Sequence, residues 1–313
     1  MAIPTGTLTQ ISSMQNLVQS AYDQYVRMAL RSIPVMRALA DVKPVQQAMP
    51  GSSVVFSIYS DLSTATGTLT ETSDVSSIAL GNPSQVTVTL NEYGSAVTTT
   101  KKLNLTSFND VDSALADIIA YNAADSIDSV VAAVLTGSTG TNVIYGGAAT
   151  GTNSITSSGT ITAANIRKAV VQLRSNKAVP RIGDLYAAYL HPRQSADLRA
   201  ESGTGGFQEL TKYVDRTPFV AGAVGVLEGA FIVETPRVPS AANTQSPAVT
   251  VYSAVVAGRE ALAEATVQDT SVVIGPEIDA LRRFRTIGWY YFGGFARLRE
   301  AALFRIESSA TNG

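Results

Sequence analysis

Apolar residues recur along this chain at two spacings, one typical of helices and the other of strands. Helical spacing appears first, in the N-terminal arm that we assign to residues 1–50. The positions on this helical face are Met14, Leu17, Val18, Ala21, Tyr22, Tyr25, Val26 and Ala29. The pattern predicts an amphipathic helix, which either packs in the core of its own subunit or covers a neighbouring one.

Strand-like alternation follows in two short runs. Val54, Phe56 and Ile58 form the first run, and Val86, Val88 and Leu90 form the second. They predict an extended hairpin within residues 51–104, with a polar loop that is longer than compact domains usually tolerate. Because a two-stranded hairpin is only marginally stable in water, we expect its apolar face to rest on another surface, such as a second chain.

A long helix is predicted over residues 110–135, where apolar positions recur at helical spacing. At 1.5 Å per residue it would be roughly 40 Å long. The sequence favours solvated surface positions for the four aspartates along it, because no other residue completes a paired-carboxylate site. These aspartates are Asp112, Asp117, Asp125 and Asp128.

The second half of the chain has an α/β texture, separated from the long helix by a segment rich in Gly, Thr, Ser and Asn over residues 136–160. We expect a helix after Thr162, a strand over 185–190, a helix at His191-Pro192, and strands near 231–233 and 249–256. From residue 279 onward, aromatic residues and arginines alternate as in paired strands. The predicted order is therefore an α/β unit followed by a β-rich C-terminal tail.

Composition narrows the class of protein. Only 15% of the residues are charged while 45% are hydrophobic, and the net charge is −2. So few charges suit a protein whose surface is covered by neighbours, or a β-rich secreted protein such as an adhesin or decoration module. The weak net charge disfavours non-specific nucleic-acid binding, and we expect no apolar stretch to approach the roughly 20 residues of a membrane span.

Candidate chemistry is scarce. The chain has no cysteine and one histidine, His191, and we find no nucleophile elbow, phosphate-binding loop, dinucleotide fingerprint or histidine-based metal motif. A carboxylate-based hydrolase that uses His191 as a base stays open, although a histidine before a proline at a helix start favours a structural role. We therefore expect no catalytic residue, no cofactor and no metal site.

Several segments together resemble the major capsid proteins of tailed bacteriophages, which have the HK97 fold. The residues that carry the resemblance are the hairpin opened by 50–56 and closed at 90–94, the rod over 110–135, the run 185–192 and the run 225–235. The last run, Gly-Val-Leu-Glu-Gly-Ala-Phe-Ile-Val-Glu-Thr, is the most specific. The resemblance implies an α+β HK97-like fold with an N-terminal arm (1–50), an E-loop hairpin (51–104), a peripheral domain that contains the spine helix (105–160 and 275–313) and an axial domain (161–274).

The same resemblance implies a function. The chain would be a structural, non-enzymatic capsid protein that assembles in the host cytoplasm as hexamers and pentamers. The resulting icosahedral shell of the virion would enclose double-stranded DNA without sequence-specific binding. Separate scaffolding, decoration and portal proteins would be further partners, with no membrane involved. An encapsulin-like nanocompartment built on the same fold is the alternative.

The hairpin gives this function a physical hypothesis. Its apolar side chains would be buried against a neighbouring subunit, and its acidic loop would lie near arginines of that neighbour. The expected intersubunit residues are Phe56, Ile58, Asp61, Glu71, Asp74, Val88, Arg297 and Arg299.

Overall fold

The structure is a computed structural model. It describes most of the chain from residue 34 onward, in the ranges 34–44, 53–59, 61–69, 71–72, 74–75, 77–107, 111–137, 142–201 and 223–311. The helix expected over residues 14–29 lies outside the described residues.

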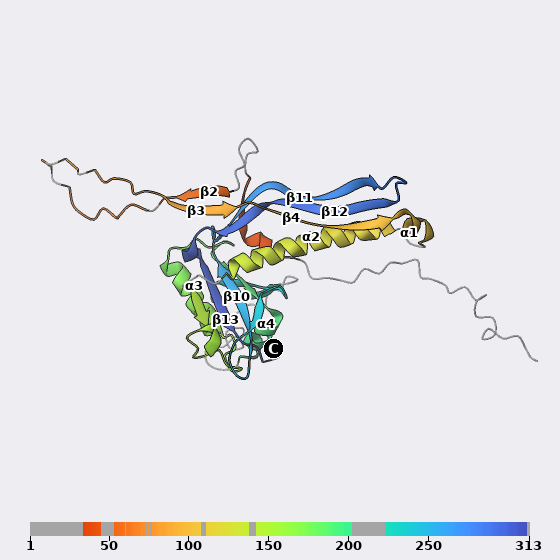
Figure 1. Cartoon of the computed structure of the whole chain (residues 1–313). Helices are drawn as coiled ribbons and strands as arrows, with labels where there is room; N and C mark the ends of the chain where they lie inside the picture. The colour runs from red at the N-terminus through yellow and green to blue at the C-terminus, as the bar shows by residue number, and fades with distance from the viewer. Residues whose placement is uncertain are drawn as a thin grey trace, which may run out of the picture.

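A long, narrow sheet of four strands forms one half of the molecule, in the order β1-β11-β12-β4. β11 (Leu262–Ile278) and β12 (Phe284–Arg297) make an antiparallel hairpin, and β4 (Asn91–Thr100) pairs along β12. β1 (Ala40–Pro44) runs parallel to the start of β11. In Figure 1 this sheet reaches away from the rest of the chain and ends beside the short helix α1 (Lys101–Thr106).

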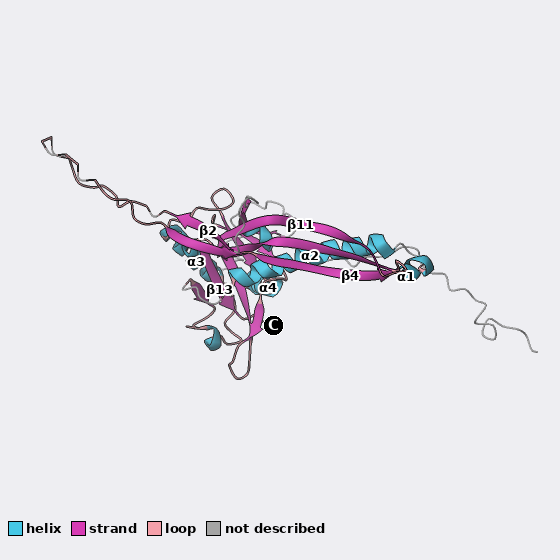
Figure 2. Ribbon diagram, turned by 45° about the horizontal axis from the view of Figure 1, so that its top comes forward, coloured by secondary structure: helices cyan, strands magenta, loops and turns pink. Residues whose placement is uncertain are grey.

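The predicted long helix is confirmed as α2 (Val111–Leu135), which lies along one face of the long sheet (Figures 1 and 2). Ile119, Ala123 and Ile127 are buried against Ile287 and Trp289 of β12. The Trp289 indole also donates a hydrogen bond to Asn122 Oδ1 at 2.9 Å. The helix is therefore fixed along its length by one apolar face.

One of the four aspartates of α2 contradicts the expectation of surface positions. Asp128 is completely buried, and it accepts hydrogen bonds from the backbone N–H groups of Val35 and Arg37. Asp125 is half-buried and paired with Arg237, whereas Asp117 is exposed. Periodicity missed Asp128 because its partners are more than 90 residues away in sequence.

The expectation that no segment approaches a membrane span was also wrong in one respect. Leu115–Leu135 is a 21-residue stretch that is apolar enough to cross a bilayer by length and composition. The core helix of a soluble protein passes the same test. Here Val131, Ala132 and Leu135 pack with Met36 and Leu39 in the protein interior.

A mixed seven-stranded sheet forms the other half, with the strand order β5-β13-β10-β6-β8-β7 and β9 added beside β10. The strands are β5 (Val143–Tyr145), β6 (Tyr186–Leu190), β7 (Ala223–Leu227), β8 (Ala230–Glu234), β9 (Ser240–Ala242), β10 (Thr250–Ala257) and β13 (Leu303–Ser308). The sheet packs with α3 (Ala163–Ser175) and with Leu198 of α4 (Pro192–Ala200) in one core. The 3-10 turns within the described ranges are η3 (Met36–Leu39), η4 (Thr152–Ser154) and η5 (Glu300–Ala302).

Strand pairing divides the chain differently from the expected domain boundaries. β5 and β13 fall in the ranges assigned with the long helix, yet both lie in the seven-stranded sheet. β4 and the first part of β11 fall in the ranges assigned to the hairpin and the axial domain, yet both lie in the long sheet. The chain crosses between the two halves several times, and local pattern carries no signal for such long-range pairing.

Both sheets contribute an arginine to the end of α2. Arg297 from β12 donates to the Gly137 carbonyl at 3.2 Å, and Arg305 from β13 donates to the carbonyls of Thr136 and Gly137. The last carbonyls of a helix lack intrahelical partners and carry a partial negative charge, so cations stabilise them. The C-terminus of α2 is thus a point where the two halves meet.

Candidate functional site

The extended hairpin projects from the molecule, as Figure 1 shows at the end opposite α1. β2 (Ser53–Ile58) and β3 (Ser84–Thr89) pair antiparallel as predicted, and within the described residues they form a sheet of their own. The described residues of the connecting loop are almost entirely exposed. The hairpin therefore offers a long surface to solvent.

The base of this hairpin rests on its own chain. Val88 is fully buried and Phe56 is half-buried, and both belong to a cluster that includes Ala265 and Phe292 of the long sheet. This corrects the expected intersubunit role of Val88, because a side chain enclosed by its own subunit cannot reach a neighbour. The support that a marginal hairpin needs comes here from β11 and β12.

A glycine makes this packing possible. A Cβ atom on Gly294 would lie 2.1 Å from the Thr89 carbonyl oxygen and 2.9 Å from Val88 Cγ1. β3 thus crosses directly over the backbone of β12. In the sequence, Gly293-Gly294 interrupts the alternation of aromatic residues and arginines along β12, and this close crossing explains the glycine at 294.

Beyond the base, the hairpin exposes large apolar side chains. Six of them are between 56% and 76% exposed, namely Tyr59, Leu62, Leu69, Val75, Ile78 and Leu80. Contiguous exposed apolar residues mark interaction surfaces in soluble proteins. The expected contact residues Asp61, Glu71 and Asp74 are exposed on the same loop, and Ile58 is half-buried at its start.

The hairpin region has one sign of charge. Residues 44–100 contain Asp61, Glu71, Asp74 and Glu92 but no lysine or arginine. At the opposite end of the molecule, the exposed residues of α1 and the β11–β12 turn have a net positive charge. Lys101, Lys102, Arg282 and Arg283 outnumber Asp279, which pairs with Arg283, and the exposed Leu105 and Leu281 lie beside them. The two ends are therefore complementary in charge and both apolar in part.

The two arginines expected to receive the acidic loop are engaged within their own chain. Arg297 is largely buried, with a side-chain exposure of 16%, and it pairs with Glu300 at 3.0 Å. Arg299 is 45% exposed and lies 3.6 Å from Glu260. Arg299 is thus the more accessible of the two to another molecule.

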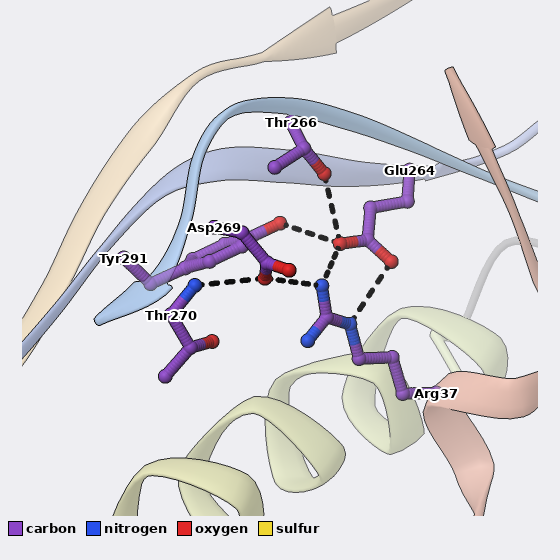
Figure 3. Close-up of polar contacts among 6 residues, drawn as sticks. All are labelled: Arg37, Glu264, Thr266, Asp269, Thr270 and Tyr291. Carbon is purple, nitrogen blue, oxygen red and sulfur yellow. Dashed lines mark hydrogen bonds and ion pairs between the residues drawn. The ribbon is translucent and has the colours of Figure 1, made fainter. Parts of the chain in front are cut away.

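A second feature, missed by sequence reasoning, is the strap, which we define as residues 34–44 (η3 and β1). Figure 3 shows Arg37 of the strap reaching toward carboxylates of β11. Its guanidinium donates to Glu264 at 2.6 and 3.2 Å and to Asp269 at 2.9 Å. The Tyr291 hydroxyl and the Thr266 hydroxyl also donate to Glu264, at 3.0 and 2.9 Å. The buried carboxylate is thereby surrounded by donors.

Electrostatics follow from this geometry. The hydrogen bond from Arg37 lowers the pKa of Asp269, while burial raises the pKa of Asp128 and backbone N–H groups of the strap oppose that rise. Burial and the nearby Glu264 charge raise the pKa of Tyr291, so this hydroxyl keeps its proton and acts as a donor. A lone glutamate in the apolar run Leu262-Ala-Glu-Ala was the available sequence signal for this network.

His191, the residue of the open hydrolase alternative, has a structural part in the fold. Its Nδ1 accepts a hydrogen bond from the Arg193 backbone at the start of α4, and its ring lies 4.5 Å from that of Tyr252. Burial lowers the pKa of His191. The described residues contain no group of three or more residues that could hold a metal ion.

Comparisons with known proteins agree with this architecture. A family model described as phage capsid protein matches residues 9–310. The capsid of Ralstonia phage GP4 is similar with a TM-score of 0.76 and 16% identity, over 97% of this chain and 98% of that chain. No curated protein sequence matches the chain.

Other phage capsids give similar values. The capsid of cyanophage P-SCSP1u aligns with a TM-score of 0.69 and 16% identity, over 98% of this chain and 97% of that one. The capsid of Helicobacter pylori bacteriophage KHP30 aligns with a TM-score of 0.67 and 14% identity, over 98% of this chain and 100% of that one. These likenesses confirm the expected α+β capsid fold, and the family match over nearly the whole sequence shows that the chain belongs to the phage capsid protein family.

Proposed function

We propose that this chain is a major capsid protein that associates as hexamers and pentamers into an icosahedral shell around double-stranded DNA, with a structural rather than an enzymatic role. The membership of the phage capsid family supports the proposal. The observation that carries it is the projecting hairpin, whose exposed apolar side chains have no cover within the described part of their own chain.

The hairpin becomes a source of association energy when a neighbour covers it. Burying one large apolar side chain contributes about 1.5–3 kcal/mol, so several of those in the loop would stabilise a contact between copies substantially. The low charge content of the chain fits a surface that neighbours cover in this way. The near-neutral net charge of −2 fits a shell that encloses DNA without specific contacts to it. Separate scaffolding, decoration and portal proteins are further partners in this proposal.

Opposite charges on two copies indicate which residues we expect to face each other in this contact. Glu71 and Asp74 on the loop of one copy lie near Arg299 of a neighbour in this proposal, because Arg299 is accessible while Arg297 is largely enclosed. A rim contact of this kind contributes more to the choice of partner than to affinity.

Electron microscopy with sedimentation of the double variant Glu71→Lys/Asp74→Lys tests the contact. We expect free subunits or small oligomers where the unsubstituted chain gives closed particles. Asp184→Lys reverses an exposed carboxylate elsewhere and should assemble normally. Unchanged assembly of the double variant would refute the acidic contact.

A charge swap then identifies the receiving surface. If Arg299 is the partner, adding Arg299→Glu to the double variant should restore particles. Rescue by Arg282→Glu instead would move the contact to the far end of the long sheet. If the unsubstituted chain stays a monomer with and without its natural partner proteins, the capsid function itself is refuted.

A further inference from the structure

The strap lies where the two halves of the molecule meet. Met36 and Leu39 are completely buried, in a cluster with residues from α2, the long sheet and the seven-stranded sheet. The other members from those elements include Val131, Leu135, Ala187, Tyr189, Val255, Leu262 and Leu303. The strap therefore fills the junction between the two sheets and does not lie on either one alone.

Polar contacts fix the strap to each of these parts separately. Toward α2, Asp128 accepts the backbone N–H groups of Val35 and Arg37, at 3.3 and 2.9 Å. Toward the long sheet, Arg37 binds Glu264 and β1 pairs in parallel with β11. These contacts hold η3 between a helix and a strand that are far apart in the sequence.

The seven-stranded half holds the strap from the other side. Arg181, in the loop before β6, donates to the Ala38 carbonyl at 2.8 Å and lies 3.4 Å from the Asp41 carboxylate. Asp41 also accepts the backbone N–H of Glu260 at 2.8 Å, in the turn between β10 and β11. A displacement of the strap would thus disturb contacts to both halves at once.

Two buried carboxylates make this seating specific. Asp128 and Glu264 are both completely buried, and their hydrogen bonds to the strap satisfy charges that would otherwise be isolated in the interior. A strap that shifted by the length of one hydrogen bond would leave both carboxylates without these donors. The junction therefore favours one seated position of the strap over intermediate ones.

From this arrangement we propose that the strap is a wedge that couples the N-terminal segment to the angle between the two sheets, so that its seating on Asp128 and Glu264 selects the shape of the subunit. Residues 1–33 directly precede the strap in the sequence, so a molecule that bound them would act on the wedge. The inference concerns the subunit itself, and only its consequence for shell size rests on the proposed function.

Hydrogen exchange on the whole chain tests the coupling with the variant Asp128→Asn/Glu264→Gln, which keeps the shape and an acceptor oxygen at both sites but removes both charges. We expect about tenfold faster exchange in the strap together with its surroundings on both halves, namely residues 128–135, 178–190 and 262–266. Glu234→Gln is the control, because Glu234 of β8 is a partly buried carboxylate that is also paired with an arginine, Arg199, away from the strap.

Two results would overturn the proposal. Faster exchange confined to residues 34–44 would show that the strap loosens without affecting the junction. Equal acceleration throughout the molecule, including β7 and β8, would show that the strap is only a general stabiliser. Asp269→Ala, which removes a 71% exposed partner of Arg37, gives a milder variant in case the double variant does not fold.

Particle size is the second readout. If the strap selects the angle, particles assembled from the double variant should vary in diameter, while those of the control keep one size. A single unchanged size with faster exchange at the junction would refute the link to shape. Failure of the unsubstituted chain to form particles would count against the proposed function and leave the exchange result decisive for the strap.

Discussion

The strap and the extended hairpin are neighbours in sequence, yet the subunit holds them in opposite ways. The strap buries its large apolar side chains and binds carboxylates or arginines of three other parts of the chain. The hairpin is anchored at its base, and its loop leaves large apolar side chains in solvent.

The contrast teaches which contacts belong to the folded subunit and which belong to assembly. A buried charged network is costly unless every member has a partner, so it must be complete before other copies arrive. Exposed apolar surface is tolerated at the level of one chain and becomes favourable when a partner covers it. The strap therefore stabilises the folded subunit, whereas the exposed part of the hairpin stabilises contacts between subunits.

Breaking the strap should produce the largest effect on stability. Arg37→Ala leaves Glu264 charged and buried without its guanidinium partner, and we expect a loss of about 3–5 kcal/mol in the free energy of unfolding. Urea unfolding of dissociated subunits measures it. Arg283→Ala breaks an exposed ion pair of the long sheet and should cost no more than about 1 kcal/mol. Equal losses in the two variants would contradict the contrast.

Breaking the hairpin base should have a smaller effect, confined to the hairpin. Gly294→Ala places a Cβ atom against the backbone of β3, which costs about 1–3 kcal/mol as overpacking and should lift the hairpin from the sheet. Limited proteolysis should then cut residues 53–89 faster while the rest of the chain resists.

The control for this experiment is Gly67→Ala in the hairpin loop, where an added Cβ meets no atom within 4 Å. It should leave the cleavage rate unchanged. If Gly294→Ala also leaves it unchanged, β3 is not held by its crossing over β12.

Acid should produce the smallest of these effects on the free energy of unfolding, through the ion pair between Arg37 of the strap and the exposed Asp269. Because Arg37 lowers the pKa of Asp269 in the folded state, this pair stabilises the fold above the unfolded pKa of aspartate, about 3.9, and the stabilisation is lost as the pH falls through the lower folded value. Asp128 acts in the opposite direction, since its pKa is raised by burial.

The difference between the unsubstituted chain and Asp269→Asn isolates this contribution. Urea midpoints measured from about pH 5 to about pH 3 should converge toward the acid end. Because the Asp269 side chain is 71% exposed, added salt should reduce the difference. A difference that is constant over this pH range would contradict the assignment.

Local pattern predicted the parts of this fold that local physics determines. Helical periodicity located α2 within one residue at its start, and strict alternation located β2 and β3. It missed β11, whose alternation is disturbed by irregularities in its pairing with β12 and whose outer half is exposed on both faces. Local pattern could not predict the contacts of the strap, because Arg37 and Glu264 are 227 residues apart in sequence.

The candidate site was predicted in outline but not in detail. The composition of the hairpin predicted that it is acidic and lacks lysine and arginine. Because an isolated two-stranded hairpin is only marginally stable, the sequence also predicted that another surface must support it. That the support comes from its own chain at Val88 depends on a glycine crossing that only the fold reveals. Buried Asp128 shows the same limit, since an aspartate on a helix looks solvated until its partners are known.

The position of the last strand has a consequence during synthesis. β13 lies between β5 and β10 inside the seven-stranded sheet, and its Arg305 also binds the carbonyls at the end of α2. A ribosome that has not yet released residues 303–308 therefore holds a chain that lacks one of the inner strands of this sheet. The seven-stranded sheet can close only after residues 303–308 have left the ribosome, so shorter nascent chains lack the form that would let them join a growing particle.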